Sequence, residues 1–211
     1  MNKKRVRLIV SFIAFILALF LSFKFDSEIV GAISKMRGEI LNEFFLGITF
    51  VSSEIIIFFL LTTLFLWKDR RRRWILPLWA TLGISIIVSF FMKVGSHRLR
   101  PFQQGIVSTP EILIGASYST WNFSFPSFQA MMVFAALPII SKEFRNTKIV
   151  WAIFAGLVAF SRIYVGMHFL SDVLVGSAIG LLIGVLVVKF EDKKGLGNKA
   201  VKKLGIKRKE S

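Results

Sequence analysis

The chain has 211 residues, of which 55% are hydrophobic and 23 are Phe, and its formal net charge is +16. So apolar a composition excludes a disordered chain, a collagen-like fibre and a small disulfide scaffold, and it indicates an integral membrane protein. The absence of Cys excludes disulfides, thiolate metal sites and a cysteine nucleophile. The basic residues stand in short blocks between apolar runs, so the charge does not indicate a nucleic-acid partner.

The apolar residues gather in six segments, each close to the roughly 20 residues that a helix needs to cross a bilayer core. The segments are 8–23, 47–67, 74–92, 127–140 with its flanks, 149–164 and 169–188. The first segment resembles a signal peptide because basic residues precede it. No small-x-small cleavage site follows it, so we expect an uncleaved membrane anchor. The predicted fold is all-α, a six-span transmembrane helical bundle that forms one membrane domain over residues 1–211.

The distribution of Lys and Arg predicts the orientation of this bundle. Most of the 28 basic residues lie in segments 1–7, 68–73, 142–148 and 189–211. Basic residues favour the cytoplasmic side, and an even number of spans then leaves both termini in the cytoplasm of a plasma or cytoplasmic membrane. The run at 68–73 and the basic tail at 190–211 are interpreted as topology signals that also contact anionic lipids.

The segment between the first two spans carries apolar residues at helical spacing from Ile29 to Phe45, opposed by charged residues. This pattern predicts an amphipathic helix on the outer membrane surface. The simpler role of this helix is to pack against the bundle and anchor it at the membrane surface. The alternative is that it acts as a gate through which a lipid enters the site.

Polar residues at the outer ends of the spans form a second pattern, drawn from distant parts of the chain. They include Lys93, His97, Arg98, Arg100, Ser127, Gln129, Arg162, His168 and Asp172. Several cations directed at one place are typical of a phosphate site, which needs no metal. His168 and Asp172 are four residues apart and so share a helix face, where the carboxylate can orient the imidazole as a nucleophile. Taken singly, such residues are more often helix caps or snorkelling side chains.

The joint spacing of these residues resembles a known signature. Its parts are Lys93 followed after six residues by Arg100-Pro101, then Pro126-Ser127, and then Ser161-Arg162 with His168 and Asp172. This region, residues 93–172, is similar to the three-part signature of the type-2 phosphatidic acid phosphatase and haloperoxidase superfamily, and the six-span layout resembles its membrane lipid phosphatase branch.

The resemblance implies a metal-independent hydrolase without a cofactor, acting on a phosphorylated lipid at the outer membrane face. It implies that Lys93, Arg100 and Arg162 bind the phosphoryl oxygens and that Ser127 donates a hydrogen bond to them. It also implies that His168 attacks phosphorus to form a phosphohistidine, while Asp172 orients its ring.

The middle part of the signature departs from the family pattern, Pro-Ser-Gly-His. Phe128 replaces the Gly, adding bulk where the backbone is expected to approach phosphate, and Gln129 replaces the His that protonates the leaving group. An amide is not a general acid at ordinary pH, and general acids contribute about 10² to 10⁴ in rate. A lipid alkoxide, whose conjugate acid is about as weak as water, needs this proton, whereas a phosphate leaves well without it. Lipid diphosphates are therefore the expected substrates, isoprenoid carriers first.

Two residues are candidates to replace the missing acid. His97 shares a face with Lys93 and Arg100 if the helix of the third span continues that far. Glu54 is the one carboxylate inside the second predicted span, where an intramembrane acid is a functional candidate by default. The plainer role of Glu54 is hydrogen bonding to neighbouring serines or another helix.

Other functions are compatible with the same residues. A catalytically impaired member could bind a phosphorylated lipid without hydrolysing it, because Gln129 resembles the hydrogen-bonding end of a neutral His. A phosphotransferase would pass the phosphoryl group from His168 to an acceptor other than water. A transporter would need polar residues along the middle of several spans, and here they gather at one face.

Overall fold

The computed structural model of the protein describes residues 3–67, 69–114 and 123–203, so the last part of the basic tail lies outside the described residues. Within these ranges the regular secondary structure is helical, as expected. The elements in chain order are α1 Lys3–Ser34, α2 Glu39–Val51, α3 Glu54–Leu66, the 3₁₀ turn η1 Asp69–Trp74, α4 Ile75–Ser96, α5 Glu111–Ile114, α6 Phe128–Glu143, α7 Lys148–Tyr164, α8 Leu170–Lys194 and α9 Leu196–Lys203.

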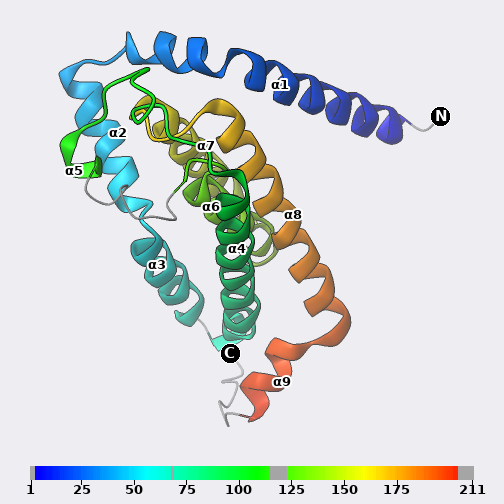
Figure 1. Cartoon of the computed structure of the whole chain (residues 1–211). Helices are drawn as coiled ribbons and strands as arrows, with labels where there is room; N and C mark the ends of the chain where they lie inside the picture. The colour runs from blue at the N-terminus through cyan, green and yellow to red at the C-terminus, as the bar shows by residue number, and fades with distance from the viewer. Residues whose placement is uncertain (1–2, 68, 115–122, 204–211) are drawn as a thin grey trace.

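Helix α6 lies at the centre of the bundle, where it packs against α4, α7 and α8 (Figure 1). Its side chains Met132, Val133 and Ile139 are buried in an apolar core together with Leu78 of α4 and Val158 of α7. Helix α1 crosses one end of the bundle, and its N-terminal half projects away from the other helices (Figure 1). The core therefore holds the two ends of α6 in fixed positions, and one of these ends carries Ser127 and Gln129.

Three glycines of α8 allow α6 to approach unusually closely. A Cβ atom at Gly176, Gly180 or Gly184 would lie 2.4, 2.0 or 2.2 Å from a backbone carbonyl oxygen of the facing segment. These glycines are four residues apart and so form one strip along α8, the small-residue pattern that brings membrane helices together. The carbonyl that faces Gly176 belongs to Ser127, so this packing sets the position of Ser127 against the start of α8.

Among the described residues, three helical stretches are long and apolar enough to cross a membrane, namely Arg5–Ser34, Arg71–Ser96 and Leu170–Lys194, and the bent pair α2–α3 makes a fourth if it counts as one span. Helices α6 and α7, with 16 and 17 residues, extend only about 24 to 26 Å at 1.5 Å per residue. The apolar helices agree with an integral membrane protein, while the six-span count is not confirmed.

The amphipathic helix expected over residues 29–45 is not a single helix. The chain turns at residues 35–38, so the pattern is divided between the end of α1 and the start of α2. Gly38 has an extended backbone, and the guanidinium of Arg37 donates to the carbonyl oxygens of Tyr164 and Ser108 at 2.9 and 2.6 Å. These contacts attach the turn to the bundle, which explains why one continuous surface helix does not form.

The second predicted span is bent by 62° between α2 and α3. At the bend, the hydroxyl of Ser52 donates to the carbonyl of Thr49 at 3.0 Å, and Ser53 has an extended backbone. Serine side chains that compete for backbone acceptors in this way commonly end or bend helices. Glu54 is consequently the first residue of α3 rather than a residue in the middle of a straight span.

Candidate active site

A cavity of about 680 Å³ opens beside the bend between α2 and α3. Seven of the residues predicted for the site line it: Glu54, Lys93, Arg100, Phe128, Gln129, Arg162 and His168. Most of the remaining wall is apolar and comes from α2 and α5, including Leu46, Phe50, Ile112 and Leu113. The cavity thus joins a cluster of cations to an apolar compartment of a size suited to part of a lipid.

His168 lies in the short connection between α7 and α8 and is buried. The positive φ of Gly166 turns this connection, and the backbone N–H of His168 donates to the carbonyl of Arg162 at 3.1 Å. On the ring, Nε2 lies 3.1 Å from Nη1 of Arg100. Because a guanidinium only donates, Nε2 must be the acceptor, and the proton of the neutral ring is on Nδ1.

The charge state of His168 follows from its surroundings. Burial, together with the positive charges of Arg100, Lys93 and Arg162, holds the pKa of His168 well below its usual value of 6.5. Burial also lowers the pKa of Arg100 to about 10, against the opposing effect of the Asp172 and Glu54 carboxylates. At neutral pH the site therefore presents a neutral imidazole beside a charged guanidinium, as nucleophilic attack on a phosphoryl group requires.

Two residues at or next to the cavity carry buried donors that have no hydrogen-bond partner among the described residues. They are Arg162, which lines the cavity and leaves Nε and Nη1 unpartnered, and Ser127, whose unpartnered hydroxyl directly precedes the lining residue Phe128. Buried polar groups nearly always have partners, so such a cluster is typical of a binding site. The first N–H groups of α6, which begins at Phe128, also lack intrahelical acceptors. These donors match the oxygens of a phosphoryl group.

Asp172 lies in the first turn of α8 and is fully buried. Its Oδ2 is 3.6 Å from Nδ1 of His168 and accepts hydrogen bonds from the hydroxyl of Ser124 and the N–H of Phe169. Its Oδ1 forms a 2.7 Å ion pair with Arg98. The expected approach of carboxylate and imidazole is thus present, although the oxygen is beyond ideal hydrogen-bond distance.

Two of the predicted residues lie differently from expectation. Arg98, grouped with the phosphate-binding cations, is paired with Asp172 and Asp26. His97 is the left-handed C-cap of α4, because the helix ends at Ser96, and its exposed ring packs on Phe123 at 4.8 Å. The helix does not continue far enough to bring His97 to the cavity lining, whereas Glu54 does line it.

Three residues connected to Asp172 were not identified from the sequence. Ser124 donates to Asp172 directly, and Ser171 and Asp26 are connected to it through Arg98. Asp26 could have been noticed, since it is the first acidic residue of the chain and lies three residues after the end of the first apolar segment. The two serines carry no such signal, because serine is common at helix starts and in loops.

Comparison with known proteins agrees with this geometry. The sequence profile of the PAP2 superfamily matches residues 74–196. The chain is 37% identical over 83 residues to phosphatidylglycerophosphatase B of Bacillus subtilis. This aligned region covers 34% of the chain and only 41% of that protein. It is 31% identical over 149 residues to undecaprenyl-diphosphatase BcrC of the same organism, covering 68% of the chain and 72% of BcrC.

A solved structure extends the likeness to the fold. The crystal structure of a transmembrane PAP2-type phosphatidylglycerolphosphate phosphatase from Bacillus subtilis superimposes with a TM-score of 0.64 at 26% identity, covering 92% of this chain and 98% of the other. The profile match spans more than half of the chain and includes the cavity residues from Lys93 to His168, but not those of α2 or Glu54. The chain therefore belongs to the PAP2 superfamily of membrane phosphatases.

Proposed function

We propose that the protein is a metal-independent lipid phosphatase that hydrolyses an isoprenoid diphosphate, or another lipid phosphate, through a phosphohistidine on His168. The observation that carries this proposal is the pair of buried, unpartnered donors of Arg162 in the cavity that His168 also lines, together with the unpartnered hydroxyl of Ser127 at the start of α6. A phosphoryl group would supply acceptors for these donors and lie within reach of the nucleophile.

The reaction has two steps. Nε2 of His168 forms a bond to phosphorus while the P–O bond to the leaving group breaks, and the leaving oxygen keeps the electron pair. Lys93, Arg100 and Arg162 bind the phosphoryl oxygens with Ser127. Asp172 orients the ring and stabilises the proton on Nδ1. Water then attacks the phosphohistidine, which releases inorganic phosphate and restores the imidazole.

The substrate class follows from Gln129 and from the cavity wall. Without a general acid at this position, a lipid alkoxide would leave about 10² to 10⁴ times more slowly, whereas a phosphate leaving group is little affected. The apolar wall of α2 and α5 suits a hydrocarbon chain. The likeness to an undecaprenyl-diphosphatase supports isoprenoid diphosphates as the first choice, followed by phosphatidate and phosphatidylglycerol phosphate.

Glu54 is our candidate for the missing proton donor. It lines the same cavity as Gln129 and His168, at the bend where α3 begins. In its protonated form Glu54 would donate a proton to a departing oxygen, and this proton would matter most for monophosphates.

The membrane arrangement belongs to the proposal as well. We place α6 and α7 across the membrane, which gives six spans with both termini in the cytoplasm and the site at the outer face. Their position inside the bundle supports this arrangement, because helices packed among the longer spans need not match the full bilayer thickness. The basic run at 68–73 and the tail at 190–211 would contact anionic lipids on the cytoplasmic side.

A second candidate function rests on Phe128 and Gln129. Both line the cavity, so a phosphorylated lipid could be held by the cations without being hydrolysed. In this alternative the protein is a binding member of the family.

The test is phosphate release by the purified protein in detergent and chelator, with a prenyl diphosphate and the matching monophosphate. We expect release that His168→Ala abolishes, and faster turnover of the diphosphate. Faster turnover of the monophosphate would contradict the leaving-group argument. No release from the native chain, together with activity in Gln129→His, would favour the binding function, and a phosphorylated acceptor lipid would indicate a phosphotransferase.

A further inference from the structure

Asp26 is a buried carboxylate of α1 that has no part in the chemistry described above. Its side chain is 4% exposed. It follows Phe25, whose non-helical backbone marks a kink in α1. Burial of a carboxylate is costly unless it is paired, so the partners of Asp26 indicate what it does.

The partners of Asp26 lie at the start of α8, beside Asp172. Oδ1 of Asp26 accepts a hydrogen bond from the N–H of Ser171 at 3.0 Å, and Oδ2 accepts from the hydroxyl of the same residue. Nη2 of Arg98 donates to Oδ2 at 2.7 Å. The other arm of the same guanidinium, Nη1, donates to Oδ1 of Asp172 and to the hydroxyl of Ser171, each at 2.7 Å. One guanidinium thus bridges two carboxylates from helices at opposite ends of the chain.

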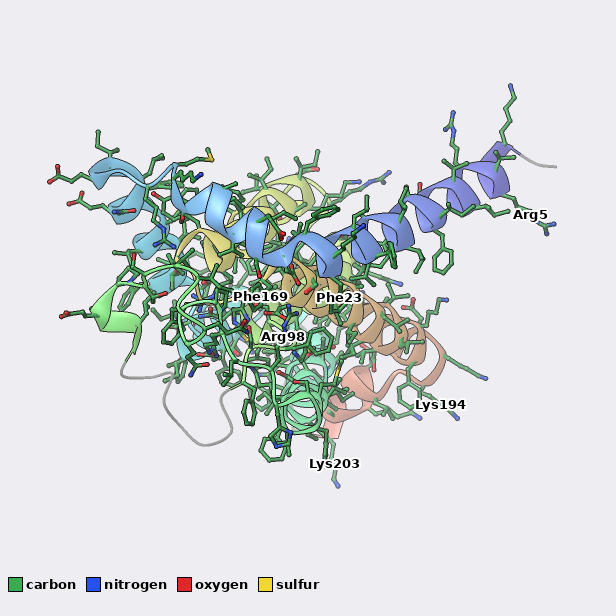
Figure 2. The ribbon with its side chains drawn as sticks, turned by 45° about the horizontal axis from the view of Figure 1, so that its top comes forward. Arg5, Phe23, Arg98, Phe169, Lys194 and Lys203 are labelled. Carbon is green, nitrogen blue, oxygen red and sulfur yellow. The ribbon has the colours of Figure 1, made fainter. Side chains whose placement is uncertain are left out.

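Aromatic rings restrict the movement of this guanidinium. The Arg98 group lies 4.2 Å from the ring centroid of Phe169 and 5.6 Å from that of Phe23. Figure 2 labels Phe23, Arg98 and Phe169, which lie close together below the ribbon of α1. Arg98 is therefore held by cation–π contacts with two rings and by carboxylates at its two Nη atoms, and these contacts restrict its orientation.

We propose that Asp26 is a positioning residue that orients Asp172 toward His168 by holding Arg98 and Ser171. Sharing the guanidinium between two carboxylates also leaves Asp172 more negative than a one-to-one pair would, so it interacts more strongly with Nδ1–H of His168. Without Asp26, Arg98 would pair with Asp172 alone and could draw its carboxylate away from the ring. In a simpler role, Asp26 would only attach α1 to the bundle.

The first test is enzymatic and rests on the proposed function. Asp26→Asn is compared with Glu28→Gln, which removes an exposed carboxylate from the same helix two residues further on. We expect Asp26→Asn to lower kcat about ten-fold or more, the usual effect of losing a group that orients a catalytic residue. KM should stay within about two-fold, because the phosphate-binding cations are untouched. Glu28→Gln should change neither constant.

The second test needs no turnover, so it separates this inference from the proposed phosphatase activity. The chain has two histidines, and the exposed His97 serves as an internal reference for His168 in ¹⁵N NMR of histidine-labelled protein. Asp26→Asn should shift the Nδ1 signal of His168 toward that of a weaker hydrogen bond and leave His97 unchanged. Glu28→Gln should move neither signal.

Ser171→Ala provides a milder change in the same network, in case Asp26→Asn does not fold. It removes one hydroxyl and should shift His168 in the same direction by a smaller amount. Unchanged His168 signals in the folded Asp26 variant, or in Ser171→Ala if only that variant folds, would overturn the inference. If the unmodified protein releases no phosphate but the substitution still shifts the His168 signal, the phosphatase function is rejected and the positioning role is retained.

Discussion

Substitution of Gly180 by Ala should displace the catalytic end of α6. An ideal Cβ at this position would lie 2.0 Å from the carbonyl oxygen of Met131, whereas ordinary contacts begin near 3.4 Å. The obstructing atom belongs to backbone, so no side-chain rotation relieves the clash. Helices α6 and α8 must separate by roughly 1 Å or more at this level, and the shift is passed to Ser127 one turn away.

A misplacement of about 1 Å near a reacting group costs on the order of 10² in rate, and such overpacking typically costs about 1–3 kcal/mol of stability. We therefore expect Gly180→Ala to release phosphate roughly 10² times more slowly and to unfold at a lower temperature. Gly156→Ala in α7 is the matched control, because its Cβ would meet nothing within 4 Å. Wild-type activity and stability in Gly180→Ala would refute the argument from helix contact.

Three further outcomes are expected from the same phosphate-release assay. Gln129→His should speed monophosphate release by about 10² or more and diphosphate release much less, because it restores a general acid; equal gains would contradict this. Glu54→Gln should slow monophosphate release more than diphosphate release, and unchanged rates would exclude Glu54 as the donor. The acidic limb of the pH profile that protonation of His168 causes should lie below 6.5, because burial and the neighbouring cations lower the pKa of His168, and a limb centred at or above 6.5 would contradict this assignment. The lowered pKa of His168 also predicts that the folded state becomes less stable as pH falls below about 6.5. In this range His168 binds a proton in the unfolded chain but not in the folded chain.

The grouping of the candidate phosphate-binding residues could be predicted because they occupy characteristic positions at the ends of apolar segments. Lys93, Arg100, Arg162 and His168 all line one cavity, as their spacing implied. Apolar composition likewise predicted helices, since a bilayer requires backbone hydrogen bonds to be satisfied within each segment. Both conclusions depend on the local order of residues and on their hydrophobicity, and both can be read directly from a sequence.

Contacts between distant segments were decided only by the tertiary structure. Arg98 stood among the polar residues grouped at the outer ends of the spans, but its guanidinium lies between Asp26 and Asp172, 72 and 74 residues away in the chain. The bend before Glu54 brings that carboxylate to the cavity wall, and the end of α4 at Ser96 leaves His97 outside. Residue type and order determine which groups are charged and which segments are apolar. Which charge meets which partner depends on how the helices pack, because a side chain pairs with the groups that folding brings within a few ångströms.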